Sequence, residues 1–187
     1  QKGSFRQFVQ AGDLIYAVEY EGRKLYVFDK KFKVLDTNPL EESNNCGLAY
    51  NKKRNVLFVV NAGQDTISIH EPSSFNQVEK IYYSDKKDAN VRGHHHLNDI
   101  CASEDYIFVS YFSHSGNYKR EVYDGGISEY HIDRLNEPPV RIVQGLWKPH
   151  SPEIIHGDLC YLDSMRGRFH TNSQIVAGEF SGFVRGL

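Results

Sequence analysis

Short apolar runs alternate with polar turns along the whole chain. Leu14–Tyr20 and Lys24–Asp29 are separated by Glu21-Gly22-Arg23, which is a hairpin signal. Further apolar runs follow at Val56–Val60, Tyr106–Ser110 and Leu159–Leu162. No segment keeps a helical apolar period over three turns. The pattern therefore predicts an all-β fold built from short strands.

A recurring tetrapeptide shows that the strands form repeated units. It occurs as Asn45–Leu48, Leu97–Ile100, Pro149–Pro152 and Val184–Leu187. Cys46 and Asn98 are 52 residues apart, Asn98 and His150 are again 52 apart, and Arg185 follows His150 by 35. A repeat of this size, made of short strands, is typical of a β-propeller blade. We therefore predict a β-propeller of four-stranded blades.

The repeat divides the chain into about four blades, at residues 10–40, 41–88, 89–145 and 146–187. Together they would form a single propeller domain over residues 1–187. A closed propeller has about 4 to 8 blades. The chain stops on what looks like an inner-strand motif, so a four-bladed ring would keep an unfinished blade. We therefore expect a larger ring of which this chain supplies only a part.

Charge and cysteine content narrow the expected partners and compartment. The 22 Lys and Arg residues nearly balance 24 Asp and Glu, which gives no argument for binding nucleic acid. No apolar stretch approaches the roughly 18 residues of a membrane span. The three cysteines sit in or beside apolar runs, which favours reduced thiols and a cytoplasmic location. The expected partner is a small-molecule ligand, and the oligomeric state stays open.

The motifs also resemble a known superfamily. The segment from Asn44 to Asp163 is similar to the six-bladed propellers of the gluconolactonase, paraoxonase and strictosidine-synthase superfamily. Leu97–Ile100 is similar to the paraoxonase motif whose asparagine binds catalytic calcium. Pro149–Pro152 and Gly182–Leu187 more closely resemble a bacterial family of propeller proteins of uncharacterised function. The resemblance implies six blades in the complete ring and, for an enzyme, a lactonase-like hydrolysis.

Two departures from the superfamily pattern disfavour calcium. His150 stands where the superfamily has a second calcium-ligand asparagine, and Arg185 stands where paraoxonases have an acidic pair. Calcium takes about six to eight oxygen ligands, and a guanidinium in that cage would repel the ion. Of the oxygen cage only Asn98 and Glu19 would remain. The cofactor is therefore left open, with a divalent metal other than calcium as one alternative.

The inner-strand positions supply the candidate site. Equivalent positions on the blades converge on one channel, so we expect Asn98, His150 and Arg185 to share a site as catalytic or binding residues. His96 and Asn98 point to the same side of an extended segment. With His150 they would form a nitrogen-rich site suited to zinc, iron or copper. The alternative is that the imidazoles make ordinary hydrogen bonds at the channel mouth.

Arg185 is expected to be buried on an inner strand and therefore paired. Its partner would be Glu19, Asp99 or Glu153, or else the anionic group of a ligand held bidentately. Asp99 follows Asn98, so its side chain either faces the sheet interior or caps a turn.

Two further residues complete the candidate set. Cys46 is either a nucleophile near His150 or a small apolar filler, and filling is favoured because nothing nearby lowers the pKa of its thiol. Trp147 either packs in the turn between blades or forms an aromatic wall of the pocket.

Three functions follow from these candidates. The first is a small-molecule site on the channel axis, with or without hydrolysis, for an anionic or hydroxylated, sugar-like ligand. The second is a non-catalytic propeller that serves as an interaction scaffold. The third is a divalent-metal-dependent hydrolase or lactonase.

Overall fold

The computed structural model describes residues 4–83, 93–173 and 178–187. Within these ranges the chain forms sixteen strands, two short 3₁₀-helices and no α-helix. No helix in the described part is long and apolar enough to span a membrane. The strands form four sheets, each a four-stranded antiparallel meander in chain order. The prediction of an all-β propeller with four-stranded blades is confirmed.

The strand bounds are as follows. The first blade contains β1 (Phe5–Ala11), β2 (Leu14–Glu19), β3 (Lys24–Phe28) and β4 (Val34–Pro39). The second contains β5 (Asn45–Asn51), β6 (Val56–Asn61), β7 (Thr66–His70) and β8 (Gln77–Tyr82). The third contains β9 (Leu97–Ala102), β10 (Tyr106–Tyr111), β11 (Gly125–His131) and β12 (Val140–Leu146). The fourth contains β13 (Pro149–Ile155), β14 (Asp158–Asp163), β15 (Arg168–His170) and β16 (Gly178–Glu179).

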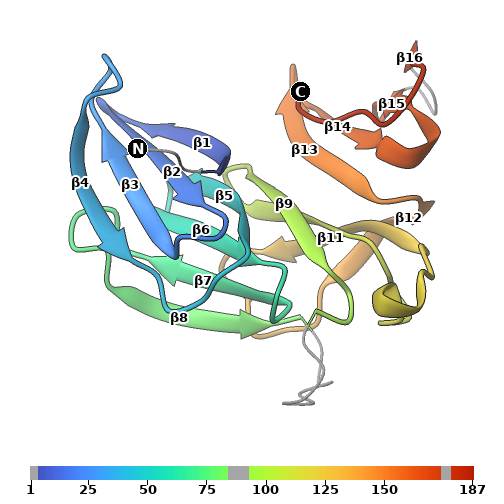
Figure 1. Cartoon of the computed structure of the whole chain (residues 1–187), viewed down its shortest axis with the longest axis horizontal. Coiled ribbons are helices and arrows are strands. Elements are labelled where there is room, and N and C mark those ends of the chain that lie inside the picture. The colour runs from blue at the N-terminus through green and yellow to red at the C-terminus, as the bar shows by residue number, and fades with distance from the viewer. Residues whose placement is uncertain (1–3, 84–92, 174–177) are drawn as a thin grey trace.

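The first strand of each blade is the inner one. Figure 1 shows the blades following one another around a common centre, from the first in blue to the fourth in orange. β1 packs on β5, β5 on β9 and β9 on β13. Among the described residues, no packing of comparable extent joins β13 to β1. Positions near the starts of the inner strands therefore lie close together.

A glycine allows one of these inner-strand contacts. A Cβ placed on Gly47 of β5 would lie 2.7 Å from the backbone oxygen of Asn98 on β9. Real Cβ atoms essentially never come that close to another heavy atom. The absence of a side chain at Gly47 therefore allows the inner strands of the second and third blades to lie this close together.

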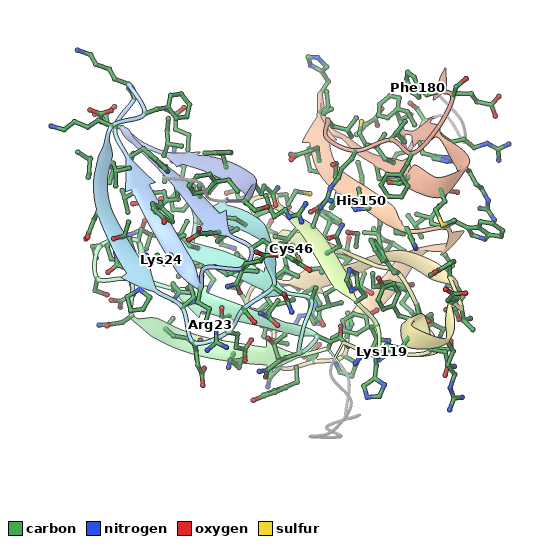
Figure 2. The ribbon with its side chains drawn as sticks, in the orientation of Figure 1. Arg23, Lys24, Cys46, Lys119, His150 and Phe180 are labelled. Atoms are coloured by element: carbon green, nitrogen blue, oxygen red, sulfur yellow. The ribbon has the colours of Figure 1, made fainter. Side chains whose placement is uncertain are left out.

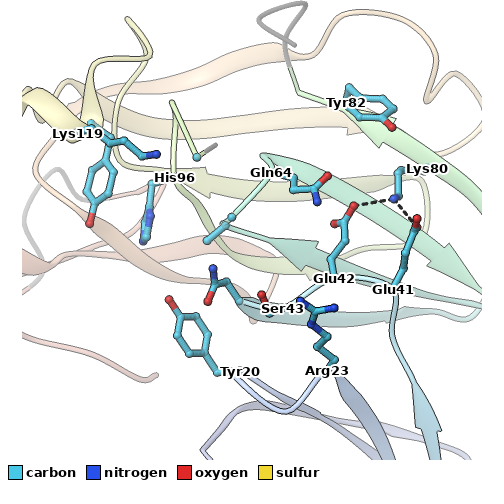
Figure 3. Close-up of a pocket in the computed structure, with 15 residues that line it drawn as sticks. Tyr20, Arg23, Glu41, Glu42, Ser43, Gln64, Lys80, Tyr82, His96 and Lys119 are labelled. Carbon is cyan, nitrogen blue, oxygen red and sulfur yellow. Dashed lines mark hydrogen bonds and ion pairs between the residues drawn. The ribbon is translucent and has the colours of Figure 1, made fainter. Parts of the chain in front are cut away.

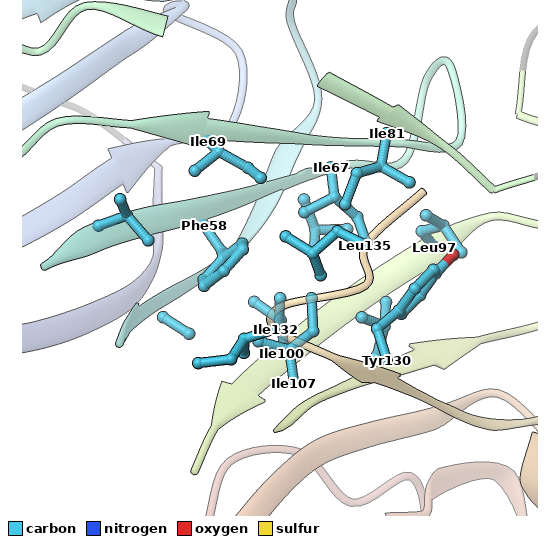
Figure 4. Packing of buried hydrophobic residues seen from close by; sticks show 14 of the residues in the cluster. Phe58, Ile67, Ile69, Ile81, Leu97, Ile100, Ile107, Tyr130, Ile132 and Leu135 are labelled. Carbon is cyan, nitrogen blue, oxygen red and sulfur yellow. The ribbon is translucent and has the colours of Figure 1, made fainter. Parts of the chain in front are cut away.

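The largest hydrophobic core lies between the second and third blades. Phe58, Ile67 and Ile69 of the second blade pack in one cluster with Ile100 and Ile107 of the third (Figure 4). All five side chains have 0% of their surface exposed. Complete burial of such a side chain contributes roughly 1.5–3 kcal/mol to the stability of the fold, relative to leaving it exposed. Hydrophobic packing between neighbouring blades thus holds the inner strands in place.

Two differences from the sequence predictions bear on the site. The first blade begins at Phe5 with a strand, β1, that the apolar pattern did not predict. The first three tetrapeptides open β5, β9 and β13, but the fourth, Val184–Leu187, is not a strand. Gly182 and Gly186 take positive φ angles of 100° and 84°, which belong to turns rather than to a ladder. The sequence pattern also predicts a strand over Ile175–Phe180, whose first residues lie outside the described part of the chain.

Candidate functional site

A pocket of about 190 Å³ lies where the inner strands converge. Its lining comes from the first, third and fourth blades and from the segment after β16: Arg6, Tyr20, His96, Asn98, Phe112, Lys148, His150, Phe183 and Arg185. Figure 2 shows His150 on the side of the fourth blade that faces the centre of the arrangement. The structure therefore brings together Asn98, His150 and Arg185, as the spacing of the repeat predicts, and adds His96 to them.

Three cationic side chains line this pocket without a carboxylate partner. Arg6, Lys148 and Arg185 form no ion pair within 4 Å in the part of the chain that the structure describes. Arg6 lies 4.5 Å from the ring centre of Tyr20, and Lys148 lies 4.3 Å from that of Tyr123. Stacking on a ring face leaves the positive charge available to an anion.

The expectations for Arg185 were wrong in part. The residue is exposed and lies outside any strand, because the segment that carries it turns away at glycines. Within the described residues its guanidinium pairs with none of the predicted partners Glu19, Asp99 and Glu153. An exposed guanidinium needs no internal partner, so the prediction that Arg185 is buried and the prediction that it is paired are both wrong.

Asn98 contributes a buried donor to the same pocket. Only 3% of its surface is exposed, and its Nδ2 atom has no hydrogen-bond partner among the residues that the structure describes. A buried donor without a partner costs about 1–3 kcal/mol relative to a satisfied one. The pocket thus combines unpaired positive charge with a donor that is already separated from bulk water.

His150 is held neutral with a defined tautomer. Its Nδ1 atom lies 2.9 Å from the carbonyl oxygen of Lys148 and 2.7 Å from Oγ of Ser164. Because a carbonyl can only accept, Nδ1 carries the proton and Nε2 has the lone pair. Burial, followed by the charge of Arg185, lowers the pKa of His150 to about 3. The ring also packs edge-on against Phe112 and Phe183.

His96 is also neutral and lies within a stack of rings. Its ring centre is 4.2 Å from that of Tyr118 and 4.6 Å from that of Phe112. Burial, then Lys148 and Arg185, lower the pKa of His96 to about 4. His96 and His150 can therefore donate or accept hydrogen bonds without adding charge at neutral pH.

The charges around the histidines do not favour the predicted metal site. Across the described residues, no group of three His, Cys, Asp or Glu side chains has an arrangement that could hold a metal ion. Lys148 and Arg185 disfavour a proton on His96 and would disfavour a divalent cation between His96, Asn98 and His150 for the same electrostatic reason. The site suits a negatively charged guest.

Cys46 and Asp99 do not line the pocket. Cys46 corresponds to Asn98 in the repeat, but its thiol turns to β9 and donates to the backbone oxygen of Asn98 at 2.9 Å. Burial raises the pKa of this thiol, so Cys46 is a filler rather than a nucleophile. The Asp99 carboxylate is buried and accepts a hydrogen bond from the backbone N–H of Ser151 at 2.9 Å. Burial also raises the pKa of Asp99.

Glu19 and Trp147 lie outside the pocket lining as well. Glu19 accepts a hydrogen bond of 3.1 Å from the hydroxyl group of Tyr26 in its own blade. Trp147 is 45% exposed, and the guanidinium of Arg166 stacks 4.8 Å from the centre of its ring. Trp147 is therefore a residue of the turn before the fourth blade and forms no wall of the pocket.

Several lining residues were missed in the sequence. Arg6 lies on the unpredicted strand β1, and Tyr20 follows directly after β2. Lys148 immediately precedes the Pro149-His150 motif, and this adjacency was the one available signal. Phe112 and Phe183 look like ordinary strand residues in sequence, so nothing there marks them as walls of a site.

A larger pocket of about 550 Å³ adjoins the first (Figure 3). Tyr20 and His96 line both pockets, so the two spaces share a wall. The Nζ atom of Lys80 lies 2.7 Å from a carboxylate oxygen of Glu41 and 2.7 Å from one of Glu42. We call the 190 Å³ space the inner pocket and the 550 Å³ space the mouth pocket.

Comparisons with known proteins support the fold alone. No family model and no curated protein matches the chain. A chain of the nidogen/laminin complex matches with a TM-score of 0.69 and 12% identity, over 99% of this chain and 69% of that one. Hydrazine synthase of Kuenenia stuttgartiensis matches with a TM-score of 0.54 and 13% identity. That match covers 87% of this chain but only 44% of the hydrazine synthase chain. At such low identity the chain shares an architecture with these proteins and no chemistry can be transferred.

Proposed function

We propose that the protein binds a small anionic ligand in the inner pocket. The observation that carries this proposal is that Arg6, Lys148 and Arg185, which pair with no carboxylate among the described residues, line the same pocket as the buried amide of Asn98. Hydrogen bonds from charged donors to anionic oxygens contribute about 1.5–3 kcal/mol each. An anion would satisfy the unpaired Nδ2 atom and neutralise mutually repelling cations in one step.

The chemistry of His150 favours binding over hydrolysis. Its Nε2 atom has a lone pair and could accept a proton from a ligand hydroxyl group. An efficient general base has a pKa near the working pH, whereas that of His150 is about 3. The imidazole is therefore better suited to orient a ligand than to activate water. This distinguishes the proposal from the metal-dependent hydrolase suggested by the superfamily resemblance.

The test is calorimetric titration of the protein with phosphate, sulfate and acetate at low ionic strength. Wild-type protein should bind at least one of them, and Arg185→Ala should bind it about tenfold or more weakly. Arg134 is the matched control, because it is exposed, does not line the pocket and, within the described part of the chain, forms an ion pair only with Glu137. Arg134→Ala should bind like the wild type.

Asn98→Leu gives an independent test, because it removes the donor but keeps an apolar side chain of similar size. It should weaken anion binding without lowering the unfolding temperature in anion-free buffer, since the unsatisfied donor is gone. The proposal is wrong if the wild type binds none of the three anions at millimolar concentration. It is equally wrong if Arg185→Ala and Asn98→Leu bind as tightly as the wild type.

A further inference from the structure

The inner pocket is too small for a complete ligand. Small-molecule sites usually enclose about 300–1,000 Å³. The inner pocket has about 190 Å³, which fits an anionic head group, and the mouth pocket has about 550 Å³. Because Tyr20 and His96 border both spaces, one molecule can place its head in the first and its body in the second.

The three cations and the amide favour a tetrahedral dianion as the head group. Arg6, Lys148, Arg185 and Asn98 reach the inner pocket from separate segments of the chain. A phosphate monoester carries about −1.5 to −2 charges at neutral pH and offers three acceptor oxygens. A planar carboxylate offers two oxygens and a single charge, so it would leave donors and positive charge unmatched.

The mouth pocket has a different character. The side chain of Lys80 is only 14% exposed, and its ammonium group pairs with Glu41 and Glu42, so it attracts no second anion. The Oγ1 atom of Thr66 also donates to Glu42, which ties this carboxylate into the wall. The buried charges of the mouth pocket are therefore already paired.

Apart from the exposed cations Arg23 and Lys119, the remaining lining of the mouth pocket suits neutral hydroxyl groups. Asn44 and Gln64 line it with side-chain amides, and Tyr20 and Tyr118 line it with rings that have a polar end. Figure 3 labels Tyr20 and Gln64 among these residues. Amides can donate and accept at once, as recognition of a hydroxyl group requires. Aromatic faces can pack against the C–H surface of a polyol or sugar ring.

We infer that the ligand is a hydroxylated organic phosphate, with its phosphate in the inner pocket and its hydroxylated body in the mouth pocket. This inference rests on the proposed anion site and adds a second contact region to it. It predicts that affinity depends on the body of the ligand as well as on its charge.

The experiment compares inorganic phosphate, methyl phosphate and three sugar phosphates by calorimetry. The sugar phosphates are glucose 6-phosphate, mannose 6-phosphate and ribose 5-phosphate. At least one of them should bind about tenfold or more tightly than methyl phosphate, which has the same monoester head but no hydroxylated body. The inference is overturned if none binds more tightly than methyl phosphate.

Two variants locate the added affinity. Asn44 has a positive φ of 64°, so Asn44→Gly removes its amide without straining the backbone. Gln64 is exposed, and Gln64→Ala removes the second amide. Both should reduce the preference for the sugar phosphate severalfold and leave methyl phosphate binding unchanged. Gln77→Ala, at the opposite end of β8 from Tyr82, is the matched control and should change neither.

The outcomes separate the two proposals. Binding of inorganic phosphate without any gain from a sugar body refutes this inference and leaves the anion site standing. Failure of inorganic phosphate, methyl phosphate and every sugar phosphate to bind refutes this inference, and it refutes the anion site as well if sulfate and acetate also fail to bind. Equal losses for methyl phosphate and sugar phosphate in Gln64→Ala would also contradict the division of roles between the two pockets.

Discussion

The neutral state of His150 should make the stability of this protein fall between pH 7 and pH 5. The pKa of His150 is about 3 in the folded protein, and that of an unperturbed histidine is about 6.5. Below pH 6.5 the unfolded chain binds a proton at this position and the folded protein does not. The stabilisation is therefore present above pH 6.5 and is lost as the pH falls toward 3.

The size of the effect follows from the two pKa values. Each pH unit between them lowers the free energy of unfolding by about 1.4 kcal/mol. At pH 5, His150 should therefore lower the free energy of unfolding by about 2 kcal/mol, since the residue is still neutral in the folded protein at that pH. His96, whose folded pKa is about 4, should contribute a loss of similar size.

The assay is urea unfolding at pH 7, 6 and 5 in phosphate-free buffer, followed by the fluorescence of Trp147, the single tryptophan. The perturbation is His150→Asn, whose amide can still donate to the carbonyl of Lys148. The wild type should lose about 2 kcal/mol more than the variant between pH 7 and pH 5. The buried carboxylic acids titrate in both proteins and cancel in this difference. Parallel losses in the two proteins would show that His150 protonates freely in the folded state, and the reasoning would fail.

Two further predictions concern the packing of the inner strands. Gly47→Ala should lower the free energy of unfolding by about 1–3 kcal/mol in urea, because the new methyl group would meet the backbone of Asn98. Gly178→Ala, where a Cβ meets only ordinary contacts at 3.4 Å or more, is the control, and equal stability of the two variants would contradict the close approach. Asp99→Asn should raise the unfolding temperature at pH 7, since burial raises the pKa of Asp99 above its unfolded value and its charge is disfavoured there. An asparagine can still accept from Ser151, and the gain should shrink as the pH falls toward 4; a constant gain or a loss would argue against this account.

The repeat was readable in the sequence because the second and third blades bury both faces. β6, Val56–Asn61, is buried at every position, so it forms a continuous apolar run rather than an alternating one. The tetrapeptides before such runs open β5, β9 and β13. Residues that are equally spaced along the chain therefore occupy equivalent positions around the centre, which is why Asn98 and His150 line one pocket.

The strand β1 could not be read in this way. Its Gln7 side chain donates to the backbone oxygen of Ile100 at 3.1 Å and accepts from the N–H of Leu48 at 2.8 Å. A polar side chain thus joins the inner strands of three blades, where an apolar pattern would be expected. Because this strand carries Arg6, one of the three cations of the pocket also escaped prediction.

The charge arrangement explains why the repeat alone could not define the ligand. A motif such as Pro149–Pro152 indicates where an inner strand begins, but not which charges the neighbouring blades present to it. Burial, followed by Lys148 and Arg185, lowers the pKa of His96, and burial, followed by Arg185, lowers that of His150. The same imidazoles that suggested a metal in sequence are therefore neutral in the fold. Asn98, proposed as an oxygen ligand for a cation, instead presents an unsatisfied N–H group beside three positive charges. The sign of the proposed guest therefore reverses from cation to anion, although the spacing of the repeat did bring Asn98, His150 and Arg185 into one pocket.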